Sequence, residues 1–93
     1  MKISVVVTNW NGIDSLKKNL EVIINSSPEA QEIFLADDAS EDDSVKYVKN
    51  LQEKYPKLKI ISHKKNIGFG ANTNDAVNKS SGDLIVLLNN DIY

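Results

Sequence analysis

The sequence has no cysteine, and its 93 residues include only four glycines, two prolines and one tryptophan. Without cysteine there is no disulfide, no thiolate nucleophile and no cysteine-based zinc site. The 11 Lys and Arg against 13 Asp and Glu give a formal net charge of −2, so the basic surplus typical of nucleic-acid or anionic-membrane binding is missing. The apolar run Ile3–Val7 is too short for a signal peptide or a membrane helix. These absences predict a cytoplasmic protein with no nucleic-acid partner and no membrane segment in this chain.

Short apolar runs alternate with segments of helical periodicity along the chain. We predict strands over residues 3–8, 32–36, 58–62 and 83–88, because each run is short, apolar and bounded by polar residues. Helical spacing follows the first strand from Asp14, follows the second up to Pro56, and recurs over residues 71–79.

This order of elements predicts an α/β fold. Strands that alternate with helices imply right-handed crossovers, so we expect a Rossmann-like three-layer α/β/α arrangement of four parallel strands and three helices, covered on both faces. At the helix ends, Ser40 with Asp43 is typical of a capping pair, and Gly82 is expected to end the third helix. The length allows one domain at most.

Polar residues follow the end of each predicted strand. They occupy residues 8–11, 37–38 and 89–91, and Asn66 with two glycines follows the third strand. Parallel sheets bind their ligands at the carboxyl ends of the strands. Because all four segments would meet at this rim, we expect the functional site there.

The acidic loop after the second predicted strand contains two kinds of carboxylate. For Asp42 and Asp43 we favour a structural role at the start of a helix, where a carboxylate near the positive N-terminal end stabilises the helix by about 0.3–1 kcal/mol. Asp38 precedes the helix, and we favour a functional role in which its carboxylate accepts hydrogen bonds from a nucleobase or a ribose. A calcium loop beginning at Asp38 is rejected, because Lys49 stands where the bidentate Glu belongs.

Three further features fit either a ligand site or the fold alone. Trp10 is a buried staple or a platform on which a base stacks, the latter worth about 1–3 kcal/mol. Residues 68–70 begin like a dinucleotide fingerprint, but Thr73 occupies the third glycine position, so a nicotinamide cofactor is not expected. The cluster at residues 63–65, His-Lys-Lys, is interpreted as solvated surface.

Asn89, Asn90 and Asp91 emerge from an apolar strand. Mg²⁺ and Mn²⁺ favour oxygen ligands, and Mg²⁺ is often held by one or two carboxylates together with substrate phosphates. A lone carboxylate at Asp91 would therefore need a diphosphate to complete the coordination of the cation.

Four segments stand in a distinctive order and spacing: residues 4–12 (SVVVTNWNG), 36–40 (ADDAS), 66–72 (NIGFGAN) and 87–91 (LLNND). Together they resemble the N-terminal, nucleotide-binding half of family 2 glycosyltransferases with the GT-A fold, over essentially the whole chain. The rhamnosyltransferase-type branch looks most similar, because its metal motif often begins with Asn. The resemblance implies inverting transfer of a sugar from a UDP- or dTDP-linked donor to a saccharide or lipid-linked acceptor, in cell-surface polysaccharide synthesis.

The same resemblance implies roles for single residues. Trp10 packs on the base with the backbone near Thr8, Asp38 hydrogen-bonds the base, and Asp91 holds a divalent cation, Mg or Mn. The predicted nucleotide-binding residues are Thr8, Asn9, Trp10, Asp38, Asn66, Gly68 and Asn90, and the predicted metal ligands are Asp91 and, less strongly, Asn89.

The catalytic base of the family lies beyond the metal motif. We therefore expect no catalytic residue in this chain and no sugar transfer by it alone. Residues 1–93 are expected to be one nucleotide-binding subdomain, truncated after the metal motif, whose unpaired sheet edge could pair with a second copy. Two alternatives stay open: a non-catalytic nucleotide-binding module, and a phosphoreceiver-like signalling domain, which would place its acid pair after the first strand.

Overall fold

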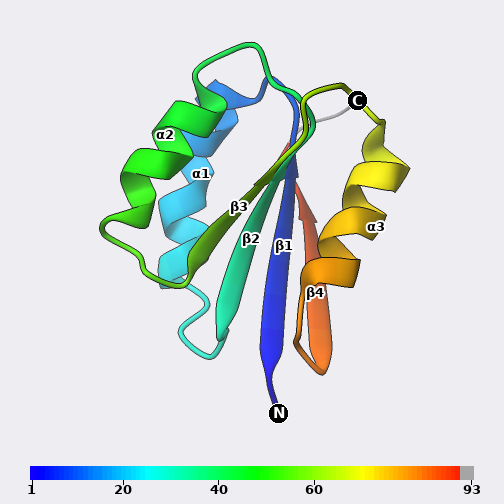
Figure 1. Ribbon diagram of the computed structural model, residues 1–93. Helices are drawn as coiled ribbons and strands as arrows, with labels where there is room; N and C mark the ends of the chain where they lie inside the picture. Colours follow the sequence, from blue (N-terminus) through cyan, green and yellow to red (C-terminus); the bar gives the residue numbers. More distant parts are fainter. Residues whose placement is uncertain (91–93) are drawn as a thin grey trace.

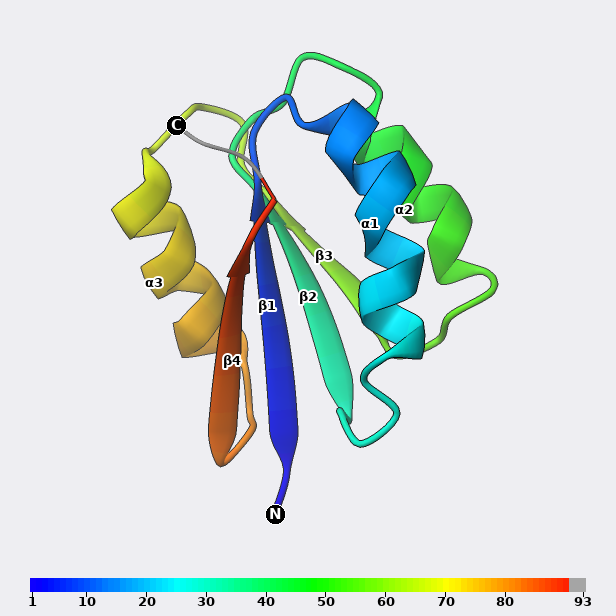
Figure 2. The same cartoon turned by 180° about the vertical axis from the view of Figure 1, so that it is seen from behind.

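Four parallel strands form the central sheet of the computed structural model, which describes residues 1–90 (Figure 1). They are β1 (Ile3–Asn9), β2 (Glu32–Asp37), β3 (Leu58–Ser62) and β4 (Leu84–Asn89), in the spatial order β3-β2-β1-β4. Helices α1 (Ile13–Asn25), α2 (Ser44–Gln52) and α3 (Phe69–Lys79) alternate with them. Helices α1 and α2 lie on one face of the sheet and α3 lies on the other (Figure 2). The predicted three-layer α/β/α fold is confirmed.

The core follows from the alternation of side chains along β1. Val5 and Val7 join the cluster that contains Leu16 and Leu20 of α1, whereas Val6 joins the opposite cluster, which contains Ala76 of α3. All six side chains are buried. Burying a Val or Leu side chain stabilises the fold by about 1.5–3 kcal/mol. The strand that carries the first rim loop is therefore held from both faces.

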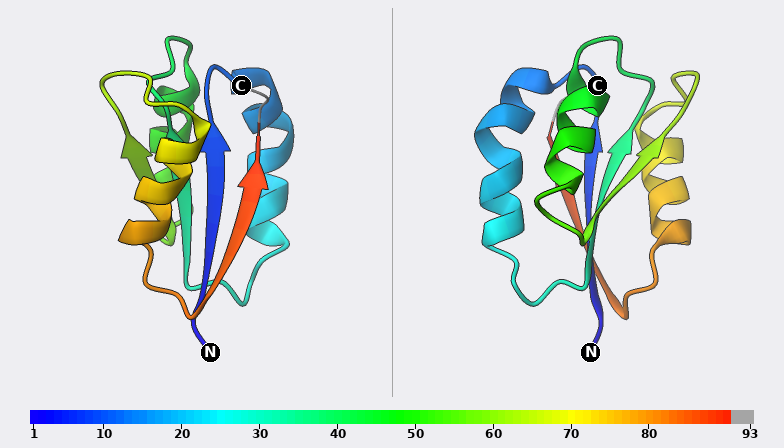
Figure 3. Two further views of the ribbon diagram at one scale, coloured as in Figure 1. Left: turned by 90° about the vertical axis from the view of Figure 1, so that its right-hand side faces the viewer. Right: turned by 60° about the vertical axis from the view of Figure 1, so that its left-hand side comes forward.

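Strand β4 departs from the expectation of a sheet covered on both faces. Leu84 and Leu87 are 47% and 53% exposed. The reason is position, because β4 pairs only with β1 and the helices pack over β1, β2 and β3 (Figure 3). The opposite edge strand, β3, carries Lys59, a charged residue of the kind that discourages pairing between edges.

The expected cap of the second helix was wrong. Helix α2 begins at Ser44, and the hydroxyl of Ser40 donates to Asp37 instead, at 2.6 Å. Asp42 takes the capping role for two helices, since its carboxylate accepts the backbone N–H groups of Ser44 at 2.9 Å and Ile13 at 3.1 Å. Burial raises the pKa of Asp42, but these hydrogen bonds outweigh it and lower the pKa. The helix-start interpretation of Asp42 is confirmed.

Gly82 does not end α3. The helix stops at Lys79, and Ser80 already has extended backbone. A Cβ on Gly82 would lie 2.7 Å from the backbone nitrogen of Ser4 and would overlap its hydroxyl. Glycine is required there by the close approach of the chain to β1. Within residues 1–90, no helix combines the length and the apolar character needed to cross a membrane.

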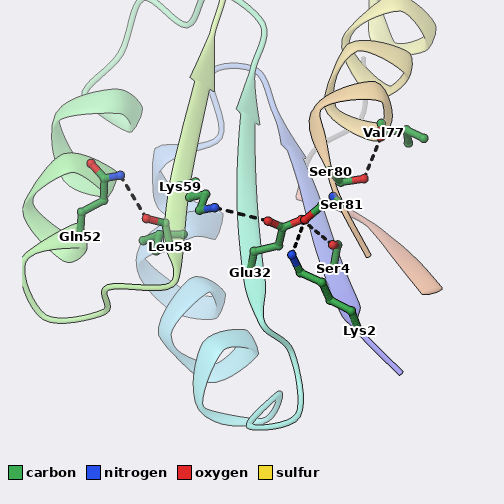
Figure 4. Close-up of polar contacts among 9 residues, drawn as sticks. All are labelled: Lys2, Ser4, Glu32, Gln52, Leu58, Lys59, Val77, Ser80 and Ser81. Atoms are coloured by element: carbon green, nitrogen blue, oxygen red, sulfur yellow. Dashed lines mark hydrogen bonds and ion pairs between the residues drawn. The ribbon is translucent and has the colours of Figure 1, made fainter. Parts of the chain in front are cut away.

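The amino-terminal end of the sheet contains a buried carboxylate, Glu32 (Figure 4). It accepts hydrogen bonds from the Ser4 hydroxyl at 2.6 Å and from the Ser81 backbone at 2.7 Å, and Lys59 lies 3.3 Å away. Glu32 thus joins β1, β3 and the segment before β4 at the end of the sheet that faces away from the rim loops.

Candidate functional site

The loops that follow β1, β2 and β3 enclose a pocket of about 590 Å³ at the carboxyl ends of the strands. The lining residues come from all three loops: Trp10, Asn11, Ala39, Ser40, Glu41, His63, Lys64, Lys65 and Asn66. Trp10 is 37% exposed, so it stands at the surface of the pocket and is not a buried staple. The predicted convergence of polar residues at one rim is confirmed for the segments after β1, β2 and β3.

Two non-glycine residues in these loops have left-handed backbone. Asn11 has φ of 52° and Ala39 has φ of 60°. For a residue with a Cβ this conformation costs about 1–2 kcal/mol. Local hydrogen bonds offset the cost, because the Asn11 side-chain oxygen accepts the Glu41 backbone N–H at 2.7 Å. Backbone strain of this kind is common at functional sites whose shape must be fixed.

Asp38 is fully buried beneath the pocket. Its carboxylate oxygens accept the backbone N–H groups of Ile67 at 2.7 Å and of Gly68 at 2.8 Å, and the Asn66 amide donates to its backbone carbonyl at 3.3 Å. Gly68 has φ of +90°, a conformation that glycine adopts without strain. In this arrangement Asp38 holds the loop between β3 and α3. Its predicted contact with a base stays a prediction, and because Asp38 is fully buried, the contact requires the surrounding loops to move so that a base can reach a carboxylate oxygen.

The His-Lys-Lys cluster at residues 63–65 lines the pocket, and Lys64 and Lys65 are exposed, as expected for solvated surface. The His63 side chain is 17% exposed, and its Nε2 lies 3.3 Å from the Asp75 carboxylate, which also pairs with Lys79 at 3.1 Å. The signal that could have found them was their position, since they follow β3 at the rim where ligands of parallel sheets bind. Lys64 and Lys65 give this side of the pocket positive charge.

The end of β4 contributes amide groups. The Thr8 hydroxyl donates to the Asn89 side-chain oxygen at 2.6 Å, and the Asn90 amide nitrogen donates to the side-chain oxygen of Asn9 at 2.7 Å. The predicted ligand Asp91 lies outside the described residues. Among residues 1–90, no cluster of three or more acidic or histidine side chains could hold a metal ion.

A family model described as Glycosyl transferase family 2 matches residues 4–93. The chain belongs to this family. A poly(ribitol-phosphate) beta-glucosyltransferase of Bacillus spizizenii is 32% identical over all of the chain, and an uncharacterized glycosyltransferase of Bacillus subtilis is 38% identical. The chain spans only 15% of the first relative and 34% of the second. The matched region is therefore only a part of the length of these relatives.

Solved structures agree with the family. Residues 1–349 of Staphylococcus aureus TarS superpose with a TM-score of 0.84 at 26% identity, covering all of this chain and 28% of that one. The TarS complex with UDP-GlcNAc gives 0.85 at 26% identity, covering 98% and 27%. A Pyrobaculum calidifontis mannosyltransferase in complex with GDP-Man and Mn²⁺ gives 0.85 at 21% identity, covering 97% and 27%, and supports the fold alone. This chain has the Rossmann-like arrangement of the GT-A fold.

Proposed function

We propose that the chain is the donor-binding part of an inverting glycosyltransferase that moves a sugar from a UDP- or dTDP-linked donor to an acceptor hydroxyl in cell-surface polysaccharide synthesis. The observation that carries the proposal is the rim pocket with Trp10 at its surface. The UDP-GlcNAc complex of TarS and the glucosyltransferase relative support a sugar nucleotide as the ligand class. The rhamnosyltransferase-type branch and a cytoplasmic location stay predictions.

The pocket offers both kinds of contact that a nucleotide needs. The Trp10 ring provides a stacking surface for a base, worth about 1–3 kcal/mol. Lys64 and Lys65 add positive charge, and Asn66 of the same loop adds an amide. The backbone near Thr8 and Gly68 borders the same rim. We place the base in this pocket, with the ribose directed toward Asn90.

The residues at the end of β4 suit a divalent cation in their chemistry. Asn89 supplies an amide oxygen, and the sequence adds the carboxylate of Asp91. Mg²⁺ and Mn²⁺ prefer such oxygen ligands. We propose Asp91 as the main ligand and Asn89 as the weaker one, since the Asn89 oxygen already accepts the Thr8 hydroxyl. When bound, the cation supplies positive charge that stabilises the leaving diphosphate.

The general base that activates the acceptor hydroxyl is proposed to lie outside this chain. The carboxylates of Asp37 and Asp38 are 1% and 0% exposed, and both already accept hydrogen bonds from nearby loops. A base must reach within hydrogen-bond distance of the proton that it removes. We therefore expect the chain to bind a donor without transferring its sugar.

Fluorescence of Trp10, the single tryptophan, tests donor binding directly. Titration with UDP or dTDP should quench it, and Mn²⁺ should tighten the binding. Asp91→Ala should abolish the effect of Mn²⁺ while binding without metal persists. Asp38→Ala should weaken binding at every metal concentration, because the pocket loop loses its anchor. Failure of both nucleotides to bind to the folded chain would refute the proposed donor binding and leave only the fold and the family as established.

A further inference from the structure

Two polar side chains lie buried side by side where β1 and β2 end. Asn9 and Asp37 are partners in the strand register, and their side chains are 0% and 1% exposed. The Asn9 amide nitrogen donates to one oxygen of the Asp37 carboxylate at 2.8 Å. Neither residue lines the pocket. A buried amide and carboxylate that do not face a ligand need a reason in the structure.

On the pocket side, Asp37 fixes two loops at once. Its carboxylate accepts both the hydroxyl of Ser40 at 2.6 Å and the backbone N–H of Ser40 at 2.9 Å. The Ser40 hydroxyl oxygen in turn accepts the backbone N–H of Asn11 at 2.8 Å. Ser40 lies in the loop after β2 and Asn11 lies in the loop after β1, and both residues line the pocket. The carboxylate thus sets the distance between the two walls.

On the other side, Asn9 reaches the strand that carries the metal motif. Its side-chain oxygen accepts the Asn90 amide nitrogen at 2.7 Å, and the same nitrogen donates to the backbone carbonyl of Gly12 at 3.1 Å. Both hydrogens of the Asn90 amide are then used, which fixes the direction of its carbonyl oxygen. Asn90 directly precedes Asp91 in the sequence.

We propose that Asn9 and Asp37 are a positioning pair that holds the nucleotide pocket and the end of β4 in one arrangement without touching the donor. This role replaces the direct contact with the nucleotide that the sequence predicted for Asn9, whose side chain is buried. The proposal rests on the proposed function of the site. The direction of each hydrogen bond makes the pair specific, because Asp37 only accepts, whereas Asn9 donates toward Asp37 and accepts from Asn90. A change in either partner leaves a buried donor facing a donor or an acceptor facing an acceptor.

Exchange of the two side chains tests the pair. Asp37→Asn puts an amide hydrogen against a donor, and Asn9→Asp puts two carboxylates together. In the double variant the carboxylate at position 9 accepts hydrogen bonds from the amide at position 37 and from Asn90. The Ser40 hydroxyl rotates and donates to the carboxylate at position 9. The bond between positions 9 and 37 and the bonds of both side chains with the Ser40 hydroxyl are then restored with reversed direction. The bonds donated by Asn90 and by the backbone N–H groups of Ser40 and Asn11 keep their direction.

We expect each single variant to bind UDP in the presence of Mn²⁺ about tenfold more weakly, because the binding-competent arrangement is less populated. The double variant should return to within about threefold of the wild type. Ser4→Ala is the matched control, since it removes a buried hydrogen bond to Glu32 at the far end of the sheet. It should lower stability and leave UDP affinity unchanged. Equal binding by a folded Asp37→Asn variant, or a folded double variant that stays as weak as the singles, would overturn the proposal.

A measurement without ligand separates this proposal from the proposed function. Hydrogen exchange at the Asn11 backbone amide should quicken in Asp37→Asn and slow again in the double variant, because this amide donates to Ser40. Unchanged exchange in Asp37→Asn would refute the positioning role even if UDP binds. Failure of the wild type to bind any nucleoside diphosphate would instead refute the proposed function, whatever the exchange rates.

Discussion

Protonation of Glu32 should remove a large part of the stability of the fold. Burial by itself raises the pKa of this carboxyl, but hydrogen bonds from Ser4, the Ser81 backbone and Lys59 outweigh it and hold the pKa at about 2, against 4.5 ordinarily. The side chain is only 5% exposed, so solvent screens these interactions little. The difference between the two pKa values corresponds to about 3 kcal/mol of folding free energy at neutral pH.

The sign of the effect follows from the lowered pKa in the folded state. The stabilisation is complete above pH 4.5, where the unfolded chain is also ionised, and it is lost as the pH falls through about 2. About 1 kcal/mol of it remains at pH 3, so about 2 kcal/mol disappears between pH 7 and pH 3. Other carboxylates titrate over the same range, and a variant is needed to isolate Glu32.

Urea unfolding of the wild type and of Glu32→Gln, followed by circular dichroism at pH 7 and pH 3, provides that comparison. The variant should be less stable at pH 7, and its deficit should shrink by about 2 kcal/mol at pH 3. Glu29→Gln, at an exposed position, is the control and should track the wild type at both pH values. A deficit of Glu32→Gln that stays constant between the two pH values would refute the reasoning.

Other substitutions test single features of the fold. Gly82→Ala should destabilise the chain by about 1–3 kcal/mol in urea unfolding, because the added methyl group meets the backbone of β1; a neutral effect would contradict the close approach. Gly68→Ala should cost about 1–2 kcal/mol at its positive φ, whereas Gly70→Ala, within α3 and with open space around it, should stabilise by about 0.5–1 kcal/mol. If the exposed edge pairs with a second copy, sedimentation should show concentration-dependent association that Leu87→Lys abolishes.

Much of the fold was predictable because its cause is local. β1 and β2 are nearly continuous apolar runs, and Leu16 and Leu20 share a helical face, so element type followed from short windows of sequence. Alternation of strands and helices then implied a parallel sheet, and a parallel sheet brings its carboxyl ends to one edge. The rim site was predictable for that reason alone.

The side-chain partners within the site were not predictable. Ser40 was expected to cap a helix, but its hydroxyl bonds Asp37 and the Asn11 backbone. For Asp38 a contact with a base was predicted and stays a prediction, and no local pattern indicated that its carboxylate accepts loop amides 29 and 30 residues away. Local pattern cannot choose between a nearby helix end and a distant backbone amide, because both satisfy the same oxygen.

The sequence by itself determined the order of the elements, the family and the rim at which the polar residues gather. Only the tertiary structure decided which polar side chains face the pocket and which support it from beneath. His63 lines the pocket, whereas Asn9 and Asp37 are buried. The physical reason is that burial and hydrogen-bond direction depend on which strands are neighbours, and the order β3-β2-β1-β4 brings together residues far apart in the chain.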